Sequence, residues 1–125
     1  MVSTGRKHSK KRDAILHTLR STTDHPSAHW VYEHLKPSIS DLSLATVYRN
    51  INLFIAEGSV LPVCVVDGKE RFDGIVEPHP HFVCTKCGQV FDLPYEHLPV
   101  LGEAGGFKID YRKSLFYGLC RHCAE

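Results

Sequence analysis

Apolar and polar residues in the first half of the chain follow the period of an α-helix. Residues 10–20 carry one apolar stripe and predict a first helix. A turn follows, in which Pro26 biases the preceding His25 toward extended geometry. Serine side chains cap helix N-termini well, so Ser27 and Ser43 predict the starts of a second and a third helix.

The apolar period changes to that of β-strands after the third helix. This helix is predicted over residues 44–57 and ends at Gly58, which suits the C′ position. Strands are predicted at residues 60–66 and 69–72, and the Asp67-Gly68 pair between them is a strong two-residue turn signal. Three helices followed directly by a hairpin predict a winged-helix domain.

The polar face of the third helix indicates contact with DNA. In a helix-turn-helix protein the recognition helix enters the major groove, and its first turns touch base edges. A basic run at the start of the chain, with no acid among its members, suits contact with phosphates. The alternative for this run is a solvated surface or a frayed end of the chain. The predicted DNA-binding residues are Thr46, Tyr48, Arg49 and Asn50 on the helix and Lys10, Lys11 and Arg12 in the basic run.

The second half of the chain predicts a smaller α/β module. Residues 73–80 lose periodicity and contain two prolines, so we place an interdomain hinge there. Beyond it the pattern predicts strands at residues 81–84, 89–93, 107–111 and 115–119 and a helix at residues 96–104. The predicted fold class is α+β, with a winged-helix DNA-binding domain (1–72), the hinge (73–80) and a small α/β domain (81–125).

Length and hydropathy are those of a small protein without a membrane span, and the net charge alone does not indicate nucleic-acid binding. With 125 residues, each of two small domains has little core of its own, and bound metal often stabilises such domains. No apolar run reaches the length of about 18 residues that spans a bilayer, and no secretory signal is visible, so we expect a cytoplasmic protein. The net charge of +1 is uneven: residues 1–60 hold eight Lys/Arg against five Asp/Glu, and residues 61–125 hold seven against nine.

Four of the five cysteines form two C-x-x-C pairs, Cys84 with Cys87 and Cys120 with Cys123. Two such pairs complete a tetrahedral zinc site with no open position, which makes the zinc structural. A thioredoxin-type redox pair is the alternative, but that motif lies at a strand-to-helix turn and needs no second pair. Cys64 lies in an apolar run and is expected to be a buried thiol.

A second group of metal-binding side chains surrounds the hinge. His79 and His81 are two apart in extended chain and project to the same face. Asp92 lies on the partner strand across the cysteine turn, and Asp73 precedes the hinge. Imidazoles and carboxylates suit a harder or borderline metal, so these four residues predict a second metal site. The alternative is exposed loop histidines without a ligand role.

Several motifs, in order along almost the whole chain, resemble the Fur (ferric uptake regulator) family. They are Ser43-Leu44-Ala45-Thr46-Val47-Tyr48-Arg49-Asn50, Arg71-Phe72-Asp73, His79-Pro80-His81-x2-Cys84-x2-Cys87-Gly88, Phe91-Asp92, Gly106-Phe107-Lys108 and Tyr117-Gly118-x-Cys120-x2-Cys123. The resemblance implies a metal-dependent repressor whose second domain mediates dimerisation. Its partners would be double-stranded operator DNA and a second copy of the chain, with no membrane and no small molecule beyond a metal ion and hydrogen peroxide.

Within the family the chain is most similar to the peroxide-sensing PerR branch. That branch holds a regulatory Fe(II) or Mn(II) through three His and two Asp. The matching positions here are His25, Asp73, His79, His81 and Asp92. The iron-uptake branch more often has Glu at the positions of the two aspartates, so the Asp pair favours peroxide sensing. The chain departs from most members in that only about residues 1–7 precede its first helix.

The resemblance also implies a mechanism. A metal that takes ligands from both domains favours one interdomain angle, which sets the distance between the two recognition helices of a dimer. Peroxide reacts at bound Fe(II), and the implied oxidation targets are His25 and His79, which become 2-oxo-histidine. The oxidised site opens and DNA is released, whereas the Mn(II) form would not react.

Two other interpretations stand beside this one. The first is a metal-uptake repressor of the same family, which senses iron, manganese or zinc without oxidation. The second is a zinc-stabilised enzyme or redox protein. The sequence contains no obvious nucleophile–base pair, and the good metal ligands are accounted for without one, so we expect no enzymatic activity.

Overall fold

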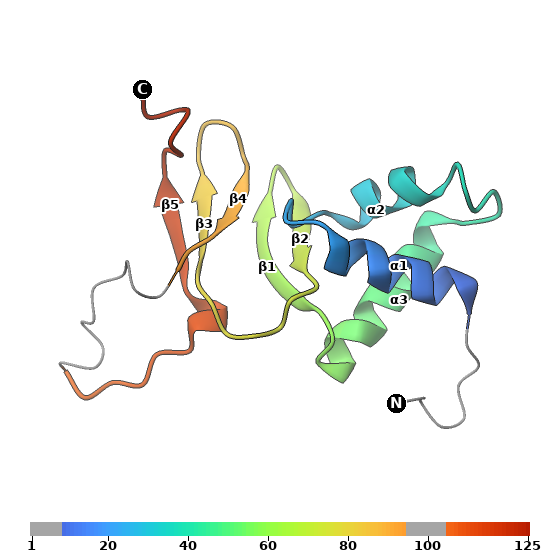
Figure 1. The fold of residues 1–125 in the computed structure, drawn as a ribbon, viewed down its shortest axis with the longest axis horizontal. Coiled ribbons are helices and arrows are strands. Elements are labelled where there is room, and N and C mark those ends of the chain that lie inside the picture. The colour runs from blue at the N-terminus through green and yellow to red at the C-terminus, as the bar shows by residue number, and fades with distance from the viewer. Residues whose placement is uncertain (1–8, 95–104) are drawn as a thin grey trace.

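Three helices and a two-stranded hairpin make up the first half of the chain (Figure 1). The computed structural model describes residues 9–94 and 105–125. The elements of this helical half are α1 (Lys10–Ser21), α2 (Ala28–Leu35), α3 (Leu44–Glu57), β1 (Leu61–Val66) and β2 (Lys69–Asp73). The three predicted helices and the predicted hairpin are confirmed, and β2 extends one residue further than predicted.

Local capping explains where the three helices begin. Ser9, Ser27 and Ser43 each accept a hydrogen bond from the backbone N–H three residues further on. Such a cap stabilises a helix by about 1 kcal/mol. Helix α3 ends at Gly58, whose φ of 80° a glycine adopts without strain. The predicted serine caps and the predicted glycine terminator are therefore confirmed.

The hydrophobic core lies among the three helices and the hairpin. Its buried members in the described part of the chain are Ile15, Leu19, Ala28, Val31, Leu42, Val47, Ile51, Phe54, Val60 and Phe72. Burying one large apolar side chain stabilises the fold by about 1.5–3 kcal/mol. Because Phe72 belongs to this core, its neighbour Asp73 is fixed relative to the helices.

A three-stranded sheet forms the second half of the chain, the sheet half. Its central strand β3 (His81–Cys84) pairs antiparallel with β4 (Val90–Asp92) and parallel with β5 (Leu115–Gly118). A short 3₁₀ helix, η2 (Tyr111–Lys113), precedes β5. The strands predicted for these three segments are confirmed, and the helix predicted at residues 96–104 lies outside the described residues.

The strand predicted at residues 107–111 is wrong. This segment is irregular up to η2, and neither sheet includes it. Phe107 and Ile109 are exposed, so their alternation does not mark a buried face. Asp110 accepts a hydrogen bond from the Arg112 N–H at 3.1 Å, and such local bonding favours the turn of a 3₁₀ helix over an extended strand.

The hairpin lies between the helices and the three-stranded sheet (Figure 1). The chain runs directly against α1 where it leaves β2. This contact is so close that a Cβ on Gly74 would lie only 2.7 Å from the backbone carbonyl of Leu19. The division of the chain at residues 73–80 into two domains stays a prediction. None of the helices in residues 9–94 and 105–125 combines the length and the apolar character needed to cross a membrane.

Candidate metal centres

The sheet topology brings the two C-x-x-C pairs to one place. Strands β3 and β5 run parallel with Cys84 opposite Gly118, so Cys84 and Cys120 lie at the same end of the sheet. Parallel neighbours need a long crossover, which explains the wide gap between the two pairs. The Sγ atoms of the four predicted zinc ligands lie within 4.8 Å of one another.

The spacing of the sulfur atoms fits zinc. Cys87 Sγ and Cys120 Sγ are 3.9 Å apart. In a tetrahedral site with Zn–S bonds of about 2.3 Å, sulfur atoms are about 3.8 Å apart. All four cysteines are free thiols, and among residues 9–94 and 105–125 the group that could hold a metal here consists of sulfur donors alone. The group therefore fits a structural Zn²⁺.

Backbone groups prepare one of these thiols to ionise. The N–H groups of Cys87 and Cys120 donate to Cys84 Sγ at 3.5 and 3.4 Å and hold the pKa of that thiol at about 6. The thiolate is the form that binds metal. The hydrogen bond with Cys120, together with burial and the other thiols, raises the pKa of Cys123 to about 12. The four groups therefore ionise together only around a cation.

The five residues predicted for the second site also meet. We call them the regulatory cluster: His25, Asp73, His79, His81 and Asp92, whose ligand atoms lie within 4.8 Å of one another. His25 lies in the loop before α2, Asp73 ends β2 and His79 lies in the link to β3. His81 begins β3 directly opposite Asp92 on β4, as predicted for these two strands.

In the regulatory cluster, three imidazoles face the same two carboxylate oxygens. Asp73 Oδ2 lies 3.3 Å from the Nε2 atom of His25 and 3.0 Å from those of His79 and His81. Asp92 Oδ1 lies 2.8, 2.8 and 3.3 Å from the same three atoms. Ligands at right angles around a metal with bonds of about 2.1 Å are about 3.0 Å apart. The spacing and the mixed nitrogen and oxygen donors fit Fe(II) or Mn(II).

Hydrogen bonds to the backbone outside the cluster orient the side chains of Asp73 and His79. Asp73 Oδ1 accepts from the Ile75 N–H at 2.9 Å, which leaves Oδ2 for the cluster. His79 Nδ1 donates to the Glu77 carbonyl at 2.7 Å, which leaves the lone pair of Nε2 facing the cluster. His25 Nδ1, in contrast, is buried without a hydrogen-bond partner among the described residues.

The cluster is buried on one side and open on the other. His25, Asp73 and His81 are 2%, 5% and 1% exposed. The side chains of His79 and Asp92 are 16% and 44% exposed. A surface hollow of about 390 Å³ opens beside these two residues. A small molecule in solution therefore reaches the cluster from the side of His79 and Asp92.

The charges of the cluster call for a cation. Burial opposes ionisation of Asp73, but hydrogen bonds from His25 and His81 outweigh it and hold the pKa of this carboxyl well below its usual range. Burial also opposes protonation of His25, yet hydrogen bonds to Asp73 and Asp92 raise the pKa of the imidazole. The pKa of His79 is raised in the same way, against burial, by the Glu77 carbonyl and the two carboxylates. Positive charge here comes from protons or from a metal ion.

Comparison with known proteins agrees with this pair of metal centres. The model of the ferric uptake regulator family matches residues 3–104. The chain belongs to this family. The predicted resemblance to the family is confirmed, and with it the α+β fold.

Individual relatives of this Fur-family chain include peroxide regulators. It is 32% identical to the peroxide operon regulator of Bacillus subtilis (strain 168) over 129 residues, which cover 100% of this chain and 89% of the relative. The solved Campylobacter jejuni peroxide stress regulator matches with a TM-score of 0.71 at 32% identity, covering 90% of this chain and 88% of that one. The Francisella tularensis ferric uptake regulator with iron matches with a TM-score of 0.78 at 27% identity, covering 100% and 99%.

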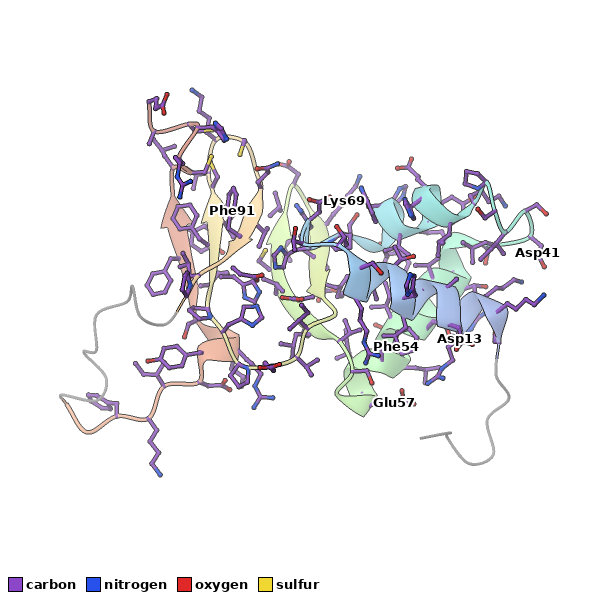
Figure 2. The ribbon with its side chains drawn as sticks, viewed as in Figure 1. Asp13, Asp41, Phe54, Glu57, Lys69 and Phe91 are labelled. Atoms are coloured by element: carbon purple, nitrogen blue, oxygen red, sulfur yellow. The ribbon has the colours of Figure 1, made fainter. Side chains whose placement is uncertain are left out.

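Two of the residues predicted to contact DNA are engaged within the Fur-family chain itself. Lys11 Nζ lies 3.1 Å from Asp41 Oδ2. Arg12 Nη2 lies 3.1 Å from Glu57 Oε1, and its guanidinium lies over the ring of Phe54 at 5.2 Å. Both partners of Arg12 belong to α3 and are labelled in Figure 2. Lys11 and Arg12 therefore connect α1 to other parts of the helical half.

The other predicted DNA contacts remain on the surface. Tyr48 and Arg49 are exposed on α3, and Lys10 is exposed at the start of α1. Thr46 is half-buried, and its Oγ1 accepts from Arg49 Nη2 at 3.2 Å. Asn50 Nδ2 donates to the Thr46 carbonyl at 2.9 Å. Tyr48, Arg49 and Lys10 are thus the members of the predicted set most accessible to a partner.

The backbone of His25 is left-handed rather than extended as predicted. Its φ is 52°, a conformation that costs a residue with a side chain about 1–2 kcal/mol. The loop is held by tertiary bonds, including the Phe72 N–H to the Pro26 carbonyl at 2.9 Å. The guanidinium of Arg71, for which the sequence motifs suggest no role, also donates to the carbonyl of His25. These contacts outweigh the local preference of a residue before proline.

Proposed function

We propose that this Fur-family chain is a metal-dependent, peroxide-sensing transcriptional repressor that binds operator DNA as a homodimer. The observation that carries the proposal is the regulatory cluster itself: three imidazoles and two aspartates from separate parts of the chain converge on one point. The similarity to proteins named as peroxide regulators supports the same function.

The cluster joins the helical half to the sheet half. His25 and Asp73 come from the helical half. His25 lies in the loop before α2, and Asp73 ends β2 beside the core residue Phe72. His79, His81 and Asp92 come from the link and the sheet. Binding one cation through all five donors selects the arrangement in which the two halves meet, to the extent that this arrangement binds the cation more tightly than others do.

Helix α3 is the proposed recognition helix of a winged-helix domain, with the β1–β2 hairpin as its wing. Tyr48 and Arg49 are exposed on α3 and suited to groove contacts. In a two-fold symmetric dimer the recognition helices must lie about 34–36 Å apart, or a multiple of this, to enter successive major grooves. The arrangement of the two halves sets this spacing and thereby DNA affinity.

The sheet half offers a surface for the proposed dimer. Strand β5 is an edge strand of its sheet. Phe116, Tyr117 and Leu119 are 43%, 60% and 51% exposed in the single chain. Large exposed apolar side chains on an edge strand and directly after it suit burial against a second copy.

The position of the histidines supports the proposed peroxide sensing. Bound Fe(II) would activate peroxide for cleavage of its O–O bond. One peroxide oxygen would add to an imidazole carbon of His25 or His79 to give 2-oxo-histidine, and the other would leave as water, so that the two-electron oxidation of the histidine balances the reduction of the peroxide. His79 lies on the open side of the cluster, and His25 is buried beside both aspartates. An oxidised imidazole is a poorer donor. The cluster then loses His25 from the helical half, or His79 from the link to the sheet, and the DNA-binding arrangement is no longer favoured.

The test compares Fe(II) with Mn(II). A DNA duplex is first selected from a randomised pool with the Mn(II)-loaded protein. The protein is then loaded anaerobically with Fe(II) and treated briefly with peroxide. Fluorescence anisotropy follows DNA binding, and mass spectrometry follows the peptides that contain His25 and His79. We expect DNA release with one added oxygen on either histidine in the Fe(II) form only.

Other outcomes contradict particular parts of the proposal. DNA binding that survives peroxide with both peptides unmodified would make the chain a metal-uptake repressor and not a peroxide sensor. A protein that selects no duplex in the presence of Mn(II) is not a metal-dependent repressor. Repeated turnover of peroxide without loss of metal or modification of the histidines would indicate an enzyme instead.

A further inference from the structure

Arg71, on strand β2, donates hydrogen bonds to backbone carbonyls of two separate loops. Its Nε donates to the carbonyl of His25, and its Nη2 donates to the carbonyl of Asp24 at 2.7 Å. Its Nη1 donates to the carbonyl of Gly88 at 3.3 Å. The first two acceptors belong to the loop that carries a member of the regulatory cluster. The third belongs to the cysteine knuckle, residues 84–88.

The cysteine knuckle is built to approach the hairpin closely. Gly88 has a φ of 76°, and a Cβ there would lie 3.2 Å from Val66 Cγ1 on β1. The Gly88 N–H donates to the Cys84 carbonyl at 2.9 Å. The direction of the Gly88 carbonyl is therefore tied to the turn that holds the Cys84 and Cys87 thiols. The bond from Arg71 thus connects the helical half to the zinc site of the sheet half.

The Nε and Nη2 groups of Arg71 support the loop that carries the metal-ligand candidate His25. His25 has a left-handed backbone, and its carbonyl accepts a hydrogen bond from Arg71 Nε in this conformation. The Nε2 atom of the same residue meets Asp73 and Asp92. A change in this backbone would therefore move a ligand atom of the cluster. A planar guanidinium carries five donors in a fixed fork, so one side chain can hold carbonyls on both loops.

We propose that Arg71 is a positioning residue of the regulatory site, which couples the His25 loop to the cysteine knuckle. The inference rests on the proposed function, since it takes the cluster to be the regulatory metal site. Within residues 9–94 and 105–125, the hydrogen bonds of Arg71 reach backbone carbonyls and no ligand atom of the cluster, so it acts by holding the backbone of the His25 loop and of the cysteine knuckle in place. It prepares the site before a cation binds, and such preorganisation raises affinity.

Three variants test this role in the zinc-loaded full-length protein. Arg71→Met keeps an unbranched apolar side chain of similar reach but removes every donor. Arg71→Lys keeps the charge but offers a single ammonium, which cannot bond to carbonyls on both loops. Lys69→Met is the matched control. It removes the same charge from an exposed side chain of the same strand. Lys69 and Arg71 line one surface hollow together with Phe91, and Figure 2 labels Lys69 and Phe91.

Two measurements are made on each variant. Calorimetric titration with Mn(II) gives the affinity of the cluster. Hydrogen exchange of the Mn(II)-free protein reports opening at residues 22–26 and at the knuckle, which is independent of metal loading. We expect Arg71→Met to bind Mn(II) about 10- to 100-fold more weakly and to exchange faster at both segments, with its zinc content unchanged. Arg71→Lys should show most of the same loss of Mn(II) affinity and most of the same increase in exchange. Lys69→Met should match the unaltered chain in both measurements.

Several results would overturn the inference. An Arg71→Met protein with unaltered Mn(II) affinity and unaltered exchange would show that Arg71 does not position the site. Full recovery in Arg71→Lys would show that charge, and not the bridge between loops, is what matters. If Arg71→Met does not fold, Arg71→Lys decides alone. Failure of the unaltered chain to bind Mn(II) would instead contradict the proposed function, which the same titration measures separately.

Discussion

Asp73 is the residue on which the regulatory cluster depends most. It is buried, and its Oδ2 atom faces all three imidazoles at 3.0–3.3 Å. Its other oxygen is held by the Ile75 N–H. Asp92 faces the same imidazoles, but its side chain is 44% exposed, so water can take over part of its role. The two aspartates are therefore unequal ligands.

Replacing each aspartate by asparagine measures this difference. We expect Asp73→Asn to weaken Mn(II) binding by about 100-fold or more, because a buried charge is lost where no water can replace it. Asp92→Asn should weaken binding by about tenfold. Calorimetric titration of Mn(II) gives both values, with zinc content as the control for folding. Equal losses in the two variants would contradict the unequal roles.

Single residues also mark the limit of what the sequence predicts. The caps at Ser27 and Ser43 and the terminator Gly58 depend on neighbours a few residues away, so local patterns were sufficient. The left-handed backbone of His25 depends on Arg71 and Phe72, which lie more than forty residues further along the chain. His25 had no metal role by spacing alone, and only the family resemblance placed it among the ligands.

At the scale of elements, α1 and the end of β2 pack in close contact at Gly74. A Cβ on Gly74 would meet the Leu19 carbonyl carbon and oxygen at 2.7 Å and the Arg20 nitrogen at 2.8 Å. These are backbone atoms of a packed helix and cannot rotate away. The close approach of α1 fixes the position of β2 and, with it, Asp73.

Gly74→Ala should therefore destabilise the protein and disturb the cluster. Overpacking of this kind costs about 1–3 kcal/mol, and the shift of Asp73 should weaken Mn(II) binding as well. Urea unfolding and Mn(II) titration measure the two effects. Ile75→Ala, at the exposed neighbouring position, is the control and should change stability little. A Gly74→Ala protein as stable as the unaltered chain would show that α1 yields at this contact.

Helices α1 and α3 should differ in their contribution to DNA binding. Arg49 is exposed on α3, whereas Arg12 on α1 is paired with Glu57 and lies over Phe54. We expect Arg49→Met to weaken binding to the selected duplex by about 1–3 kcal/mol. Arg12→Met should weaken it less, since the Arg12 guanidinium is half-buried against Glu57 and Phe54, whereas Arg49 is exposed and contacts only Thr46 of its own helix in the hydrogen bonds of the described residues. Anisotropy at fixed salt compares the two, and a larger loss in Arg12→Met would reverse this assignment.

Alternation of apolar and polar residues predicts strands correctly where the segment pairs with another strand, and wrongly where no strand of either sheet lies beside it. Residues 81–84 and 115–119 were predicted as strands, and β3 and β5 pair with each other. Residues 107–111 show the same alternation, but no strand of either sheet lies beside them. Pairing is a property of the assembled sheet, so a single segment does not reveal it. The convergence of both C-x-x-C pairs likewise required the parallel pairing of β3 with β5.

At the scale of the whole molecule, the two halves are stabilised in different ways. The helical half has a core of apolar side chains. The buried apolar side chains of the sheet half, among residues 81–94 and 105–125, are Val83, Val90 and the two cysteines Cys84 and Cys120. A half with so little core depends on its metal.

Removal of zinc with a strong chelator should therefore unfold the sheet half and leave the helical half folded. Hydrogen exchange should become fast in β3, β4 and β5 and stay slow in the buried turns of α1 and α3. Circular dichroism should keep most of its helical signal. Loss of both halves in one cooperative step would contradict this division of stability.

The central claim is that one cation joins the two halves and thereby enables DNA binding. The most direct measurement is the anisotropy of the labelled duplex with zinc-loaded protein as Mn(II) is added. It is made for the unaltered chain and for His25→Ala, which keeps four of the five donors. We predict that Mn(II) raises the DNA affinity of the unaltered chain by about tenfold or more and raises that of His25→Ala far less. DNA affinity that is independent of Mn(II), or an equal gain in His25→Ala, would contradict the account.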